Sequence, residues 1–315
     1  MANKRLHIAM RNKNDEFYTQ LSDIENELRY YKDFFKDKTV LCNCDDPRVS
    51  NFFHYFAYSF EHLGLKKLIT TCYKSQNVDL FSQNDSEQAV YLEYYGDKNG
   101  NRVPDASEIG IKPLKGDGDF RSEECIELLK EADVVVTNPP FSLFREYVEL
   151  LVRSEKKFII VGAKTAIGYK EIFKLIQENK LWLGYNSKLK TFRVPDDYDG
   201  KLLVIENGIK YVKNVGNIGW FTNIETTKRY EELEFYKKYN PDEYPKYDNY
   251  DAIEVSHTSE IPIDYDGVMG VPITFLEKYN PNQFEIVRFR KGNDDRDLSI
   301  NGKYLFSRIL IKRKK

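Results

Sequence analysis

Hydrophobic residues follow helical and strand-like spacings along the first part of the chain. Segment 21–35 has apolar residues three and four positions apart, with Ser22 as a candidate cap, and 50–63 is typical of a helix rich in Phe and Tyr. The short apolar runs 39–43 and 65–73 predict strands. The predicted order is therefore helix, strand, helix, strand.

Two different patterns precede the middle of the chain. Residues 89–103 alternate in polarity up to Asn99-Gly100, a dipeptide typical of hairpin turns, and we expect an inserted hairpin there. A capped helix is predicted over 122–132, with Glu124 near the position that closes a capping box.

A regular alternation of strands and helices follows. Strands are predicted at 133–137 and 157–162, and helices at 142–153 and 169–177. Such alternation is typical of a parallel sheet flanked by helices. We therefore expect an α/β fold with a mixed, mostly parallel sheet.

The pattern changes after Ile224. The chain becomes rich in Tyr and interrupted by Pro, and it closes with apolar stretches at 284–289 and 304–312. This change predicts a second, smaller region of α+β type. The expected boundaries are 1–36 for an N-terminal helical segment, 37–224 for the α/β domain and 225–315 for the smaller region.

Composition narrows the class of protein. The chain has 315 residues, of which 41% are hydrophobic and 31% charged, as in soluble globular proteins. No run approaches the roughly 18 apolar residues of a membrane helix, and the N-terminus lacks the apolar segment of a signal peptide, so we expect a cytoplasmic protein. The four Cys and four His show neither a disulfide framework nor metal-ligand spacing, so we expect no disulfides and no metal site.

Positive charge is concentrated at the two ends of a chain whose net charge is −2. Residues 1–14 and 303–315 contain Lys and Arg but no Asp or Glu, whereas 242–266 are strongly acidic. Two interpretations remain open: a face that binds phosphate groups, or solvated chain ends.

The most informative motif is Asn138-Pro139-Pro140-Phe141, directly after the predicted strand 133–137. A strand-ending turn is one explanation, because two prolines cannot continue a central strand and Asn suits a turn. We favour a functional site, because this combination is rare and open α/β sheets bind ligands at the carboxyl ends of their strands.

The motif fits methylation of an exocyclic amino group. Such a nitrogen is a weak nucleophile because its lone pair is conjugated with the ring. Asn138 Oδ1 and the Pro139 carbonyl can accept hydrogen bonds from its two N–H groups and draw the lone pair out of conjugation. The prolines hold these acceptors in place, and Phe141 can stack on an extruded base.

The motif resembles the catalytic motif of amino-methylating, S-adenosylmethionine-dependent methyltransferases, and the whole chain resembles the EcoRI-type adenine-specific DNA methyltransferases. This resemblance implies a class I methyltransferase-like catalytic domain at 37–224 and a target-recognition region at 225–315. The segments that carry it are Asp15–Gln20 (DEFYTQ), Asn43–Phe52 (NCDDPRVSNF), Asn138–Phe141 (NPPF) and Tyr265–Pro272 (YDGVMGVP).

The resemblance implies a site for S-adenosylmethionine made of three elements. Residues 17–19 correspond to an element at the methionine end of the cofactor, 45–47 to an acidic loop that meets its ammonium, and 116–120 to a loop that holds its adenine. The alternatives are a hydrophobic staple at a helix entry for 17–19, a capped turn for 45–47 and an ordinary glycine-rich turn for 116–120. The expected cofactor-binding residues are Phe17, Tyr18, Thr19, Asp45, Asp46, Pro47, Asp119 and Phe120.

The chain departs from the family pattern at two positions of this site. Residues 48–52 supply no G-x-G for a close approach of the backbone to the cofactor. Thr71, Cys72 and Tyr73 stand where an acid for the ribose hydroxyls is expected, so no ribose ligand is assigned.

For the target DNA, the resemblance implies an aromatic wall for the flipped base at Trp220 and Phe221, with a core aromatic pair as the alternative. The basic tail is expected to contact DNA. The expected tail residues are Lys312, Arg313, Lys314 and Lys315.

We therefore expect a sequence-specific enzyme that transfers a methyl group from S-adenosylmethionine to N6 of a flipped adenine in double-stranded DNA. It is expected to serve a restriction-modification system or to be an orphan or phage methylase, to act as a monomer without metal or membrane, and to form no stable complex with a cognate endonuclease. Two alternatives remain: methylation of RNA or of a protein amide, and non-catalytic DNA binding on a methyltransferase scaffold. The expected catalytic residues are Asn138, Pro139, Pro140 and Phe141.

Overall fold

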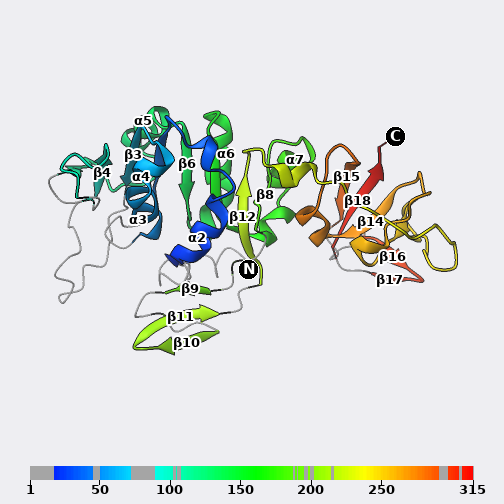
Figure 1. Cartoon of the computed structure of the whole chain (residues 1–315). Helices are drawn as coiled ribbons and strands as arrows, with labels where there is room; N and C mark the ends of the chain where they lie inside the picture. The colour runs from blue at the N-terminus through cyan, green and yellow to red at the C-terminus, as the bar shows by residue number, and fades with distance from the viewer. Residues whose placement is uncertain are drawn as a thin grey trace. The chain divides into compact units, whose positions relative to one another are not determined.

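The structure is a computed structural model in which the chain divides into two compact units (Figure 1). Unit 1 comprises Met1–Ala166 and Gly184–Ile224, and unit 2 comprises Ile167–Leu183 and Glu225–Lys315. The residues that the structure describes are 18–44, 50–71, 89–101, 104, 108–186, 189, 191–194, 198, 202–213, 216–290, 297–304 and 307–314.

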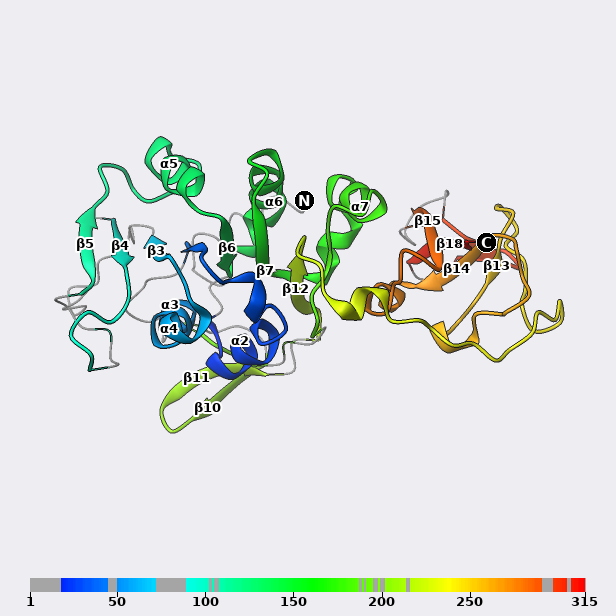
Figure 2. The same cartoon turned by 45° about the horizontal axis from the view of Figure 1, so that its top comes forward.

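Unit 1 is built on a large mixed sheet. Its strands are β2 (Thr39–Cys42), β3 (Lys67–Thr71), β4 (Val90–Tyr94), β5 (Gly110–Pro113), β6 (Val134–Thr137), β7 (Lys157–Ala163) and β12 (Ile218–Thr222). They lie in the order β5-β4-β3-β2-β6-β7-β12. Figure 2 labels all of these strands except β2. Strands β3, β2, β6 and β7 are parallel, and the outer strands are antiparallel to their inner neighbours. This confirms the expected mixed α/β architecture.

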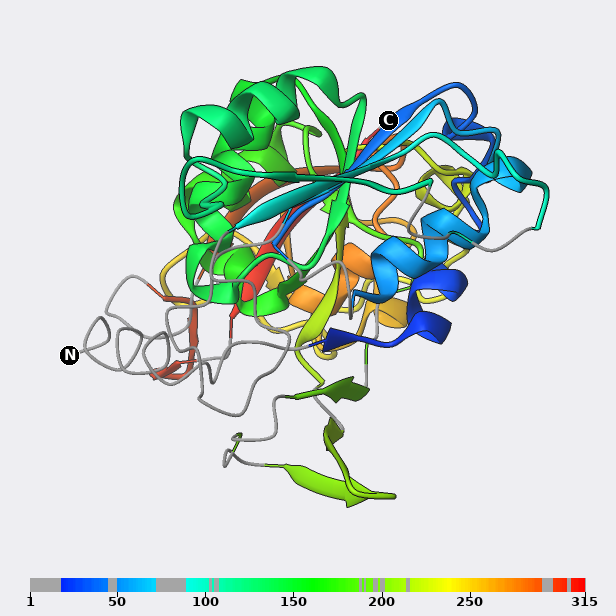
Figure 3. The ribbon, with the colours of Figure 1, turned by 90° about the vertical axis from the view of Figure 1, so that its left-hand side faces the viewer.

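Helices cover both faces of this sheet. They are α2 (Leu21–Leu28), α3 (Asn51–Tyr58), α4 (Phe60–Leu63), α5 (Glu123–Glu131) and α6 (Phe144–Arg153). Figure 3 shows α2, α3 and α4 in blue on one side of the sheet and α5 and α6 in green on the other. All residues of β2 and β6 are buried, which explains why both strands consist almost entirely of apolar and β-branched residues.

One glycine allows α6 to pack closely on β7. A Cβ atom on Gly162 would lie 2.2 Å from Cε2 of the Phe144 ring, too close for any real side chain. Phe144 is the first residue of α6 and follows the Asn138–Phe141 motif by three positions. The absence of a side chain at 162 therefore helps to set the position of the helix that follows the motif.

Several predicted helices differ from those in the structure. The helix predicted over 21–35 ends at Leu28, because Tyr31 leaves helical geometry with φ −117°, and a short 3-10 helix, η1 (Lys32–Phe34), follows. The N-cap of α2 is Gln20 and not the predicted Ser22. The helix predicted over 50–63 is divided at Ser59 into α3 and α4.

Local polar contacts explain the outcome of two predictions, the turn at Asn99-Gly100 and the cap of the helix that begins after Ser122. β4 and β5 pair antiparallel, which confirms the expected hairpin. Asn99-Gly100 lies within their long connection and is not a two-residue turn between them; Gly100 has φ 79°, and its N–H donates to Asp97 Oδ1 at 2.7 Å. Ser122 caps α5 as predicted. Glu124, however, accepts the Lys115 and Gly116 amides and closes no capping box.

Unit 1 contains a second, antiparallel sheet that the sequence patterns did not predict. Its order is β1-β9-β11-β10, with β1 at Tyr18–Thr19, β9 at Thr191–Arg193, β10 at Leu203–Glu206 and β11 at Ile209–Lys213. Asn207 and Gly208 join β10 to β11 with φ of 49° and 80°, as a tight two-residue hairpin requires. The other strands are too short to give a clear alternation, and β1 pairs with a strand far along the chain.

Unit 2 has a sheet in the order β13-β14-β18-β15. Helix α7 (Lys170–Gln177) packs on β15: the Phe173 and Phe289 ring centroids are 5.3 Å apart, and Gln177 Nε2 donates to the Val287 carbonyl at 2.8 Å. These contacts group residues 167–183 with the C-terminal part of the chain. The other elements are β8 (Trp182–Leu183), β13 (Ile253–Glu254), β14 (Met269–Pro272), β15 (Phe284–Arg290), β16 (Ser299–Ile300), β17 (Lys303–Tyr304), β18 (Arg308–Arg313) and, across both units, the 3-10 helices η2 (Phe141–Leu143), η3 (Lys164–Gly168), η4 (Thr227–Tyr230), η5 (Thr258–Glu260) and η6 (Ile273–Glu277).

Candidate active site

The Asn138–Phe141 segment leaves the sheet at the carboxyl end of β6. Strand β6 lies between β2 and β7 and is parallel to both. Asn138 is only 7% exposed and Pro139 is buried, whereas Pro140 and Phe141 are partly exposed. The two predicted acceptors thus lie at the base of the segment, and the two residues expected nearer the substrate lie at its open end.

A buried network joins the ends of β2 and β6 directly before Asn138. Asn43 follows β2 and is 6% exposed; its carbonyl oxygen accepts from Thr137 Oγ1, and its Oδ1 accepts from the hydroxyl of Tyr147 in α6. Complete burial raises the pKa of Tyr147 well above its ordinary value, so the hydroxyl stays protonated and remains a donor.

The turn after β2 has an unusual backbone. Cys44 has φ 76°, in the left-handed region that normally favours glycine. The predicted cofactor residues Asp45, Asp46 and Pro47 follow it and lie outside the described residues. Their role stays a prediction.

Strand β1 places Tyr18 and Thr19 beside the helix that follows this turn. Thr19 is 2% exposed, and its carbonyl oxygen accepts from Nδ2 of Asn51, the first residue of α3, at 2.8 Å. Thr19 Oγ1 is buried and has no hydrogen-bond partner within the described parts of the chain. Phe17 lies outside the described residues.

Asp119 and Phe120 precede α5. The Asp119 carboxylate accepts from Nε and Nη2 of Arg121 at 2.9 and 2.6 Å, and these bonds hold the pKa of Asp119 below its ordinary value. Phe120 is 7% exposed and packs edge-to-face on Tyr147, with ring centroids 5.0 Å apart. The structure thus brings Phe120 together with the Asn43–Tyr147 network and gives Asp119 a cationic partner that was not predicted.

Trp220 and Phe221 lie in β12 and are 1% and 0% exposed. Trp220 packs edge-to-face with Phe52 at 6.1 Å between centroids, and Phe221 packs on Phe144 at 4.9 Å. Both rings belong to the core of unit 1. Their role beside a flipped base stays a prediction.

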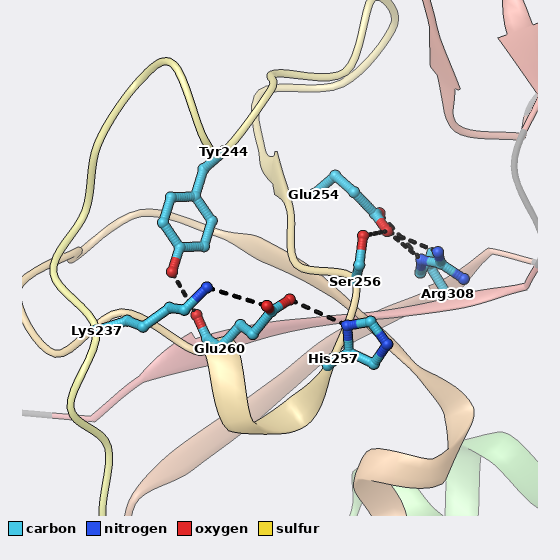
Figure 4. Close-up of polar contacts among 7 residues, drawn as sticks. All are labelled: Lys237, Tyr244, Glu254, Ser256, His257, Glu260 and Arg308. Carbon is cyan, nitrogen blue, oxygen red and sulfur yellow. Dashed lines mark hydrogen bonds and ion pairs between the residues drawn. The ribbon is translucent and has the colours of Figure 1, made fainter.

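Unit 2 contains two polar networks (Figure 4). Glu254, 6% exposed, accepts from Arg308 Nε at 3.0 Å and Nη2 at 2.6 Å. Glu260 accepts from Lys237 Nζ at 3.0 Å and lies 3.1 Å from His257 Nδ1, while its backbone oxygen accepts from the Tyr244 hydroxyl at 2.7 Å. The first network joins β13 to β18. The second joins η5 to Lys237 and Tyr244, which precede β13 in the chain.

The basic tail residues have different surroundings. Lys312 and Lys314 are exposed. The Arg313 guanidinium, in contrast, lies over the Phe235 and Phe284 rings at 5.3 and 5.5 Å from their centroids. Arg313 therefore contributes to the packing of unit 2, whereas Lys312 and Lys314, among the described tail residues, present their charges to solvent. Lys315 lies outside the described residues.

Glu27 is a buried residue that the sequence analysis missed. It is 0% exposed; Oε1 accepts the Tyr185 amide at 2.6 Å and the Tyr31 hydroxyl at 2.9 Å, and Oε2 accepts the Asn186 amide at 2.7 Å. The carboxylate thus holds the chain that leads toward β9. Its position on the apolar face of α2, next to Leu28, was the available signal.

None of the helices in the described ranges is long and apolar enough to cross a membrane. The same ranges contain no group of three His, Cys, Asp or Glu side chains that could hold a metal ion. Cys42, Cys44 and Cys125 are free thiols.

Comparison with known proteins identifies the family. The family described as "Adenine-specific methyltransferase EcoRI" matches residues 5–314. The chain is 52% identical to the Type II methyltransferase M.EcoRI of Escherichia coli over 99% of this chain and 97% of that protein. It is 39% identical to the Type II methyltransferase M.MgeORF184P of Mycoplasma genitalium (97% of each chain), and 41% identical to M.MpnI of Mycoplasma pneumoniae (89% of this chain and 83% of that protein).

The chain therefore belongs to the EcoRI family of adenine-specific DNA methyltransferases. This membership confirms the family and the enzyme class predicted from the Asn138–Phe141 motif and the segments around it.

Proposed function

We propose that this methyltransferase uses S-adenosylmethionine to methylate N6 of an adenine within a specific sequence of double-stranded DNA. It would act as the modification enzyme of a restriction-modification system or as an orphan methylase. One observation carries the proposal: Asn138 and Pro139 lie at the carboxyl end of a central parallel strand, in a chain that belongs to an adenine-specific family.

The residues around this strand end fit S-adenosylmethionine. Thr19 Oγ1 is a buried polar atom without a partner among the described residues, beside the first turn of α3. Asp119 offers a carboxylate oxygen and Phe120 an adjacent ring, as an adenine ring with its amino group requires. When bound, the cofactor supplies a methyl group made electrophilic by its sulfonium.

The protein's own contribution is to hold the target amino group. Asn138 Oδ1 and the Pro139 carbonyl accept hydrogen bonds from the two N–H groups of this amino group. These bonds stabilise a nitrogen whose lone pair has left conjugation with the ring. The two prolines fix these acceptors in advance, so no reorganisation is needed during the reaction. Phe141, partly exposed at the open end of the segment, stacks on the extruded adenine. The excess proton passes to solvent, and no titrating base is required.

The test is to incubate the purified chain with methyl-labelled S-adenosylmethionine and, separately, duplex DNA, RNA or protein. Label is expected only in DNA, as N6-methyladenine. Sequencing the DNA of an expressing host for this modified base then gives the recognition sequence. Label in RNA or protein would show a different substrate, and DNA binding without any transfer would show a non-catalytic protein.

A further inference from the structure

Asn43 is held from two directions by residues of different elements. Its side-chain oxygen accepts from the Tyr147 hydroxyl of α6, and its carbonyl oxygen accepts from Thr137 Oγ1 at the end of β6. All three residues are buried, with exposures of 6%, 0% and 0%. Water cannot replace a lost partner readily at such a site, so each hydrogen bond defines the geometry strongly.

The next residue adopts a conformation that its own side chain disfavours. Cys44 has φ 76°, where a Cβ atom is crowded and glycine is usual. Such a backbone persists only where surrounding contacts hold it. The two bonds to Asn43 are contacts of this kind, directly before the turn.

The same tyrosine supports a second part of the site. The edge-to-face contact with Phe120 involves the ring of Tyr147, whereas the contact with Asn43 involves the hydroxyl. The ring and the hydroxyl of one side chain therefore serve different elements. A change from Tyr to Phe removes the second function and keeps the first.

We propose that Tyr147 and Asn43 are positioning residues for methyl transfer. Their hydrogen bond holds the left-handed turn at Cys44 and fixes the end of β2 relative to the end of β6, from which Asn138 extends. This inference rests on the proposed function, because it assigns those strand ends to cofactor binding and catalysis. Tertiary hydrogen bonds here supply the turn geometry that glycine would supply through its backbone freedom, in a chain that lacks G-x-G at 48–52.

Tyr147→Phe tests the role of the hydroxyl in the full-length enzyme. We expect S-adenosylmethionine affinity to fall about tenfold, the loss typical of one buried hydrogen bond, and the single-turnover rate at saturating cofactor to fall as well. DNA affinity should stay unchanged. The matched control is Tyr31→Phe, which removes another buried hydroxyl of unit 1, bonded to Glu27 at 2.9 Å. The control should lower the melting temperature without changing cofactor affinity.

The acceptor side gives an independent test. Asn43→Ala removes the Oδ1 atom and should reproduce the loss of affinity seen for Tyr147→Phe. Asn43→Asp keeps an oxygen for the Tyr147 hydroxyl and should retain more affinity than Asn43→Ala. A purely structural role predicts instead that both variants lose melting temperature and keep wild-type affinity in the folded fraction.

Substitutions at Cys44 test whether the network holds the strained turn. In a Cys44→Gly background the turn needs no support, so Tyr147→Phe should cost less than about threefold in affinity. Cys44→Gly and Cys44→Ala both remove the thiol, which interacts with the Tyr147 side chain, but only Cys44→Ala keeps the Cβ atom; the full tenfold loss should therefore persist in the Cys44→Ala background. Equal losses in both backgrounds, or a Tyr147→Phe variant that behaves like Tyr31→Phe, would overturn the inference. A wild-type chain that binds no S-adenosylmethionine would instead overturn the proposed function.

Discussion

The Arg121 guanidinium donates two hydrogen bonds to the carboxylate of Asp119, from Nε to Oδ1 at 2.9 Å and from Nη2 to Oδ2 at 2.6 Å, and the Arg121 backbone N–H donates to Oδ1 at 2.8 Å. The pairing keeps Asp119 ionised, because hydrogen bonding to Arg121 lowers its pKa. A carboxylate oxygen has two lone pairs, and the described residues give Oδ2 one donor. The carboxylate therefore keeps capacity to accept a second N–H, such as the amino group of the cofactor adenine.

Removing the Asp119 carboxylate should weaken cofactor binding. Asp119→Ala is expected to lower the affinity for S-adenosylhomocysteine about tenfold, because the adenine amino group loses its acceptor. An analogue with purine in place of adenine has no such amino group and should bind the variant and the wild type equally. Calorimetric titration measures both affinities. Equal losses for the two ligands would show that Asp119 does not face the amino group.

Asn138→Ala should lower the rate of methyl transfer far more than the affinity for DNA. The proposed contacts strengthen only as the amino nitrogen leaves conjugation, so their loss raises the barrier to the chemical step. Single-turnover methylation, DNA affinity and melting temperature should be measured together. An Asn138→Ala enzyme that is folded and methylates at the normal rate would contradict the mechanism.

Phe141 should require an aromatic ring. Phe141→Ala should weaken capture of the extruded adenine, because stacking of a base on an aromatic side chain contributes roughly 1–3 kcal/mol. Phe141→Trp keeps a stacking face and should retain measurable activity. If both variants lose thermal stability and activity in parallel, the segment is a structural turn.

DNA affinity should depend on salt through Lys312 and Lys314, the exposed lysines of the tail. Replacing both with Ala should make the slope of log affinity against log salt shallower by about 2, since each phosphate contact contributes about 0.9. Lys130→Ala, an exposed lysine of unit 1 paired with Glu127, is the control and should leave the slope unchanged. Arg313→Ala should mainly lower stability because its guanidinium packs on two rings. Loss of sequence specificity with an unchanged slope would show that the lysines read bases.

Glu27 should make stability fall as pH rises. Burial raises its pKa above the usual value of 4.5, so the folded state binds the proton more tightly than the unfolded state. The contribution of Glu27 to the free energy of unfolding is fully present below about pH 4.5 and is lost as pH rises through the folded-state pKa. The total loss is about 1.4 kcal/mol for each pH unit by which the folded-state pKa exceeds the unfolded-state pKa. Urea unfolding of the wild type and of Glu27→Gln across pH isolates this group. The difference in stability should move in favour of Glu27→Gln with rising pH, and movement in the opposite direction would contradict the raised pKa.

The candidate site could be proposed from the sequence because its signals are local. The two prolines after an apolar strand end that strand, and Asn138 then stands at the carboxyl edge of the sheet whatever the rest of the chain does. The continuous run of β-branched residues in β6 likewise predicts that the strand is buried on both faces. The alternation of strands and helices predicts a parallel sheet core covered by helices. The order of the strands and the antiparallel outer pairs β3–β4, β4–β5 and β7–β12 come from the structure.

The supports of the site depend on tertiary contacts that no local pattern encodes. Tyr147 and Asn43 are 104 positions apart, and Thr137 and Asn43 are 94 apart. The element that carries Thr19 pairs with residues near 192, and Glu27 binds the amides of Tyr185 and Asn186.

The sequence by itself thus determined the family, the mixed α/β class and the position of the Asn138–Phe141 segment after a buried strand, because short-range periodicity and motif chemistry require only neighbouring residues. Only the tertiary structure decided that Trp220 and Phe221 are core rings and that Arg313 packs on the rings of Phe235 and Phe284. Burial and hydrogen-bond partnership are properties of the folded environment, and the same residue type serves a core, a surface or a site according to what packs around it.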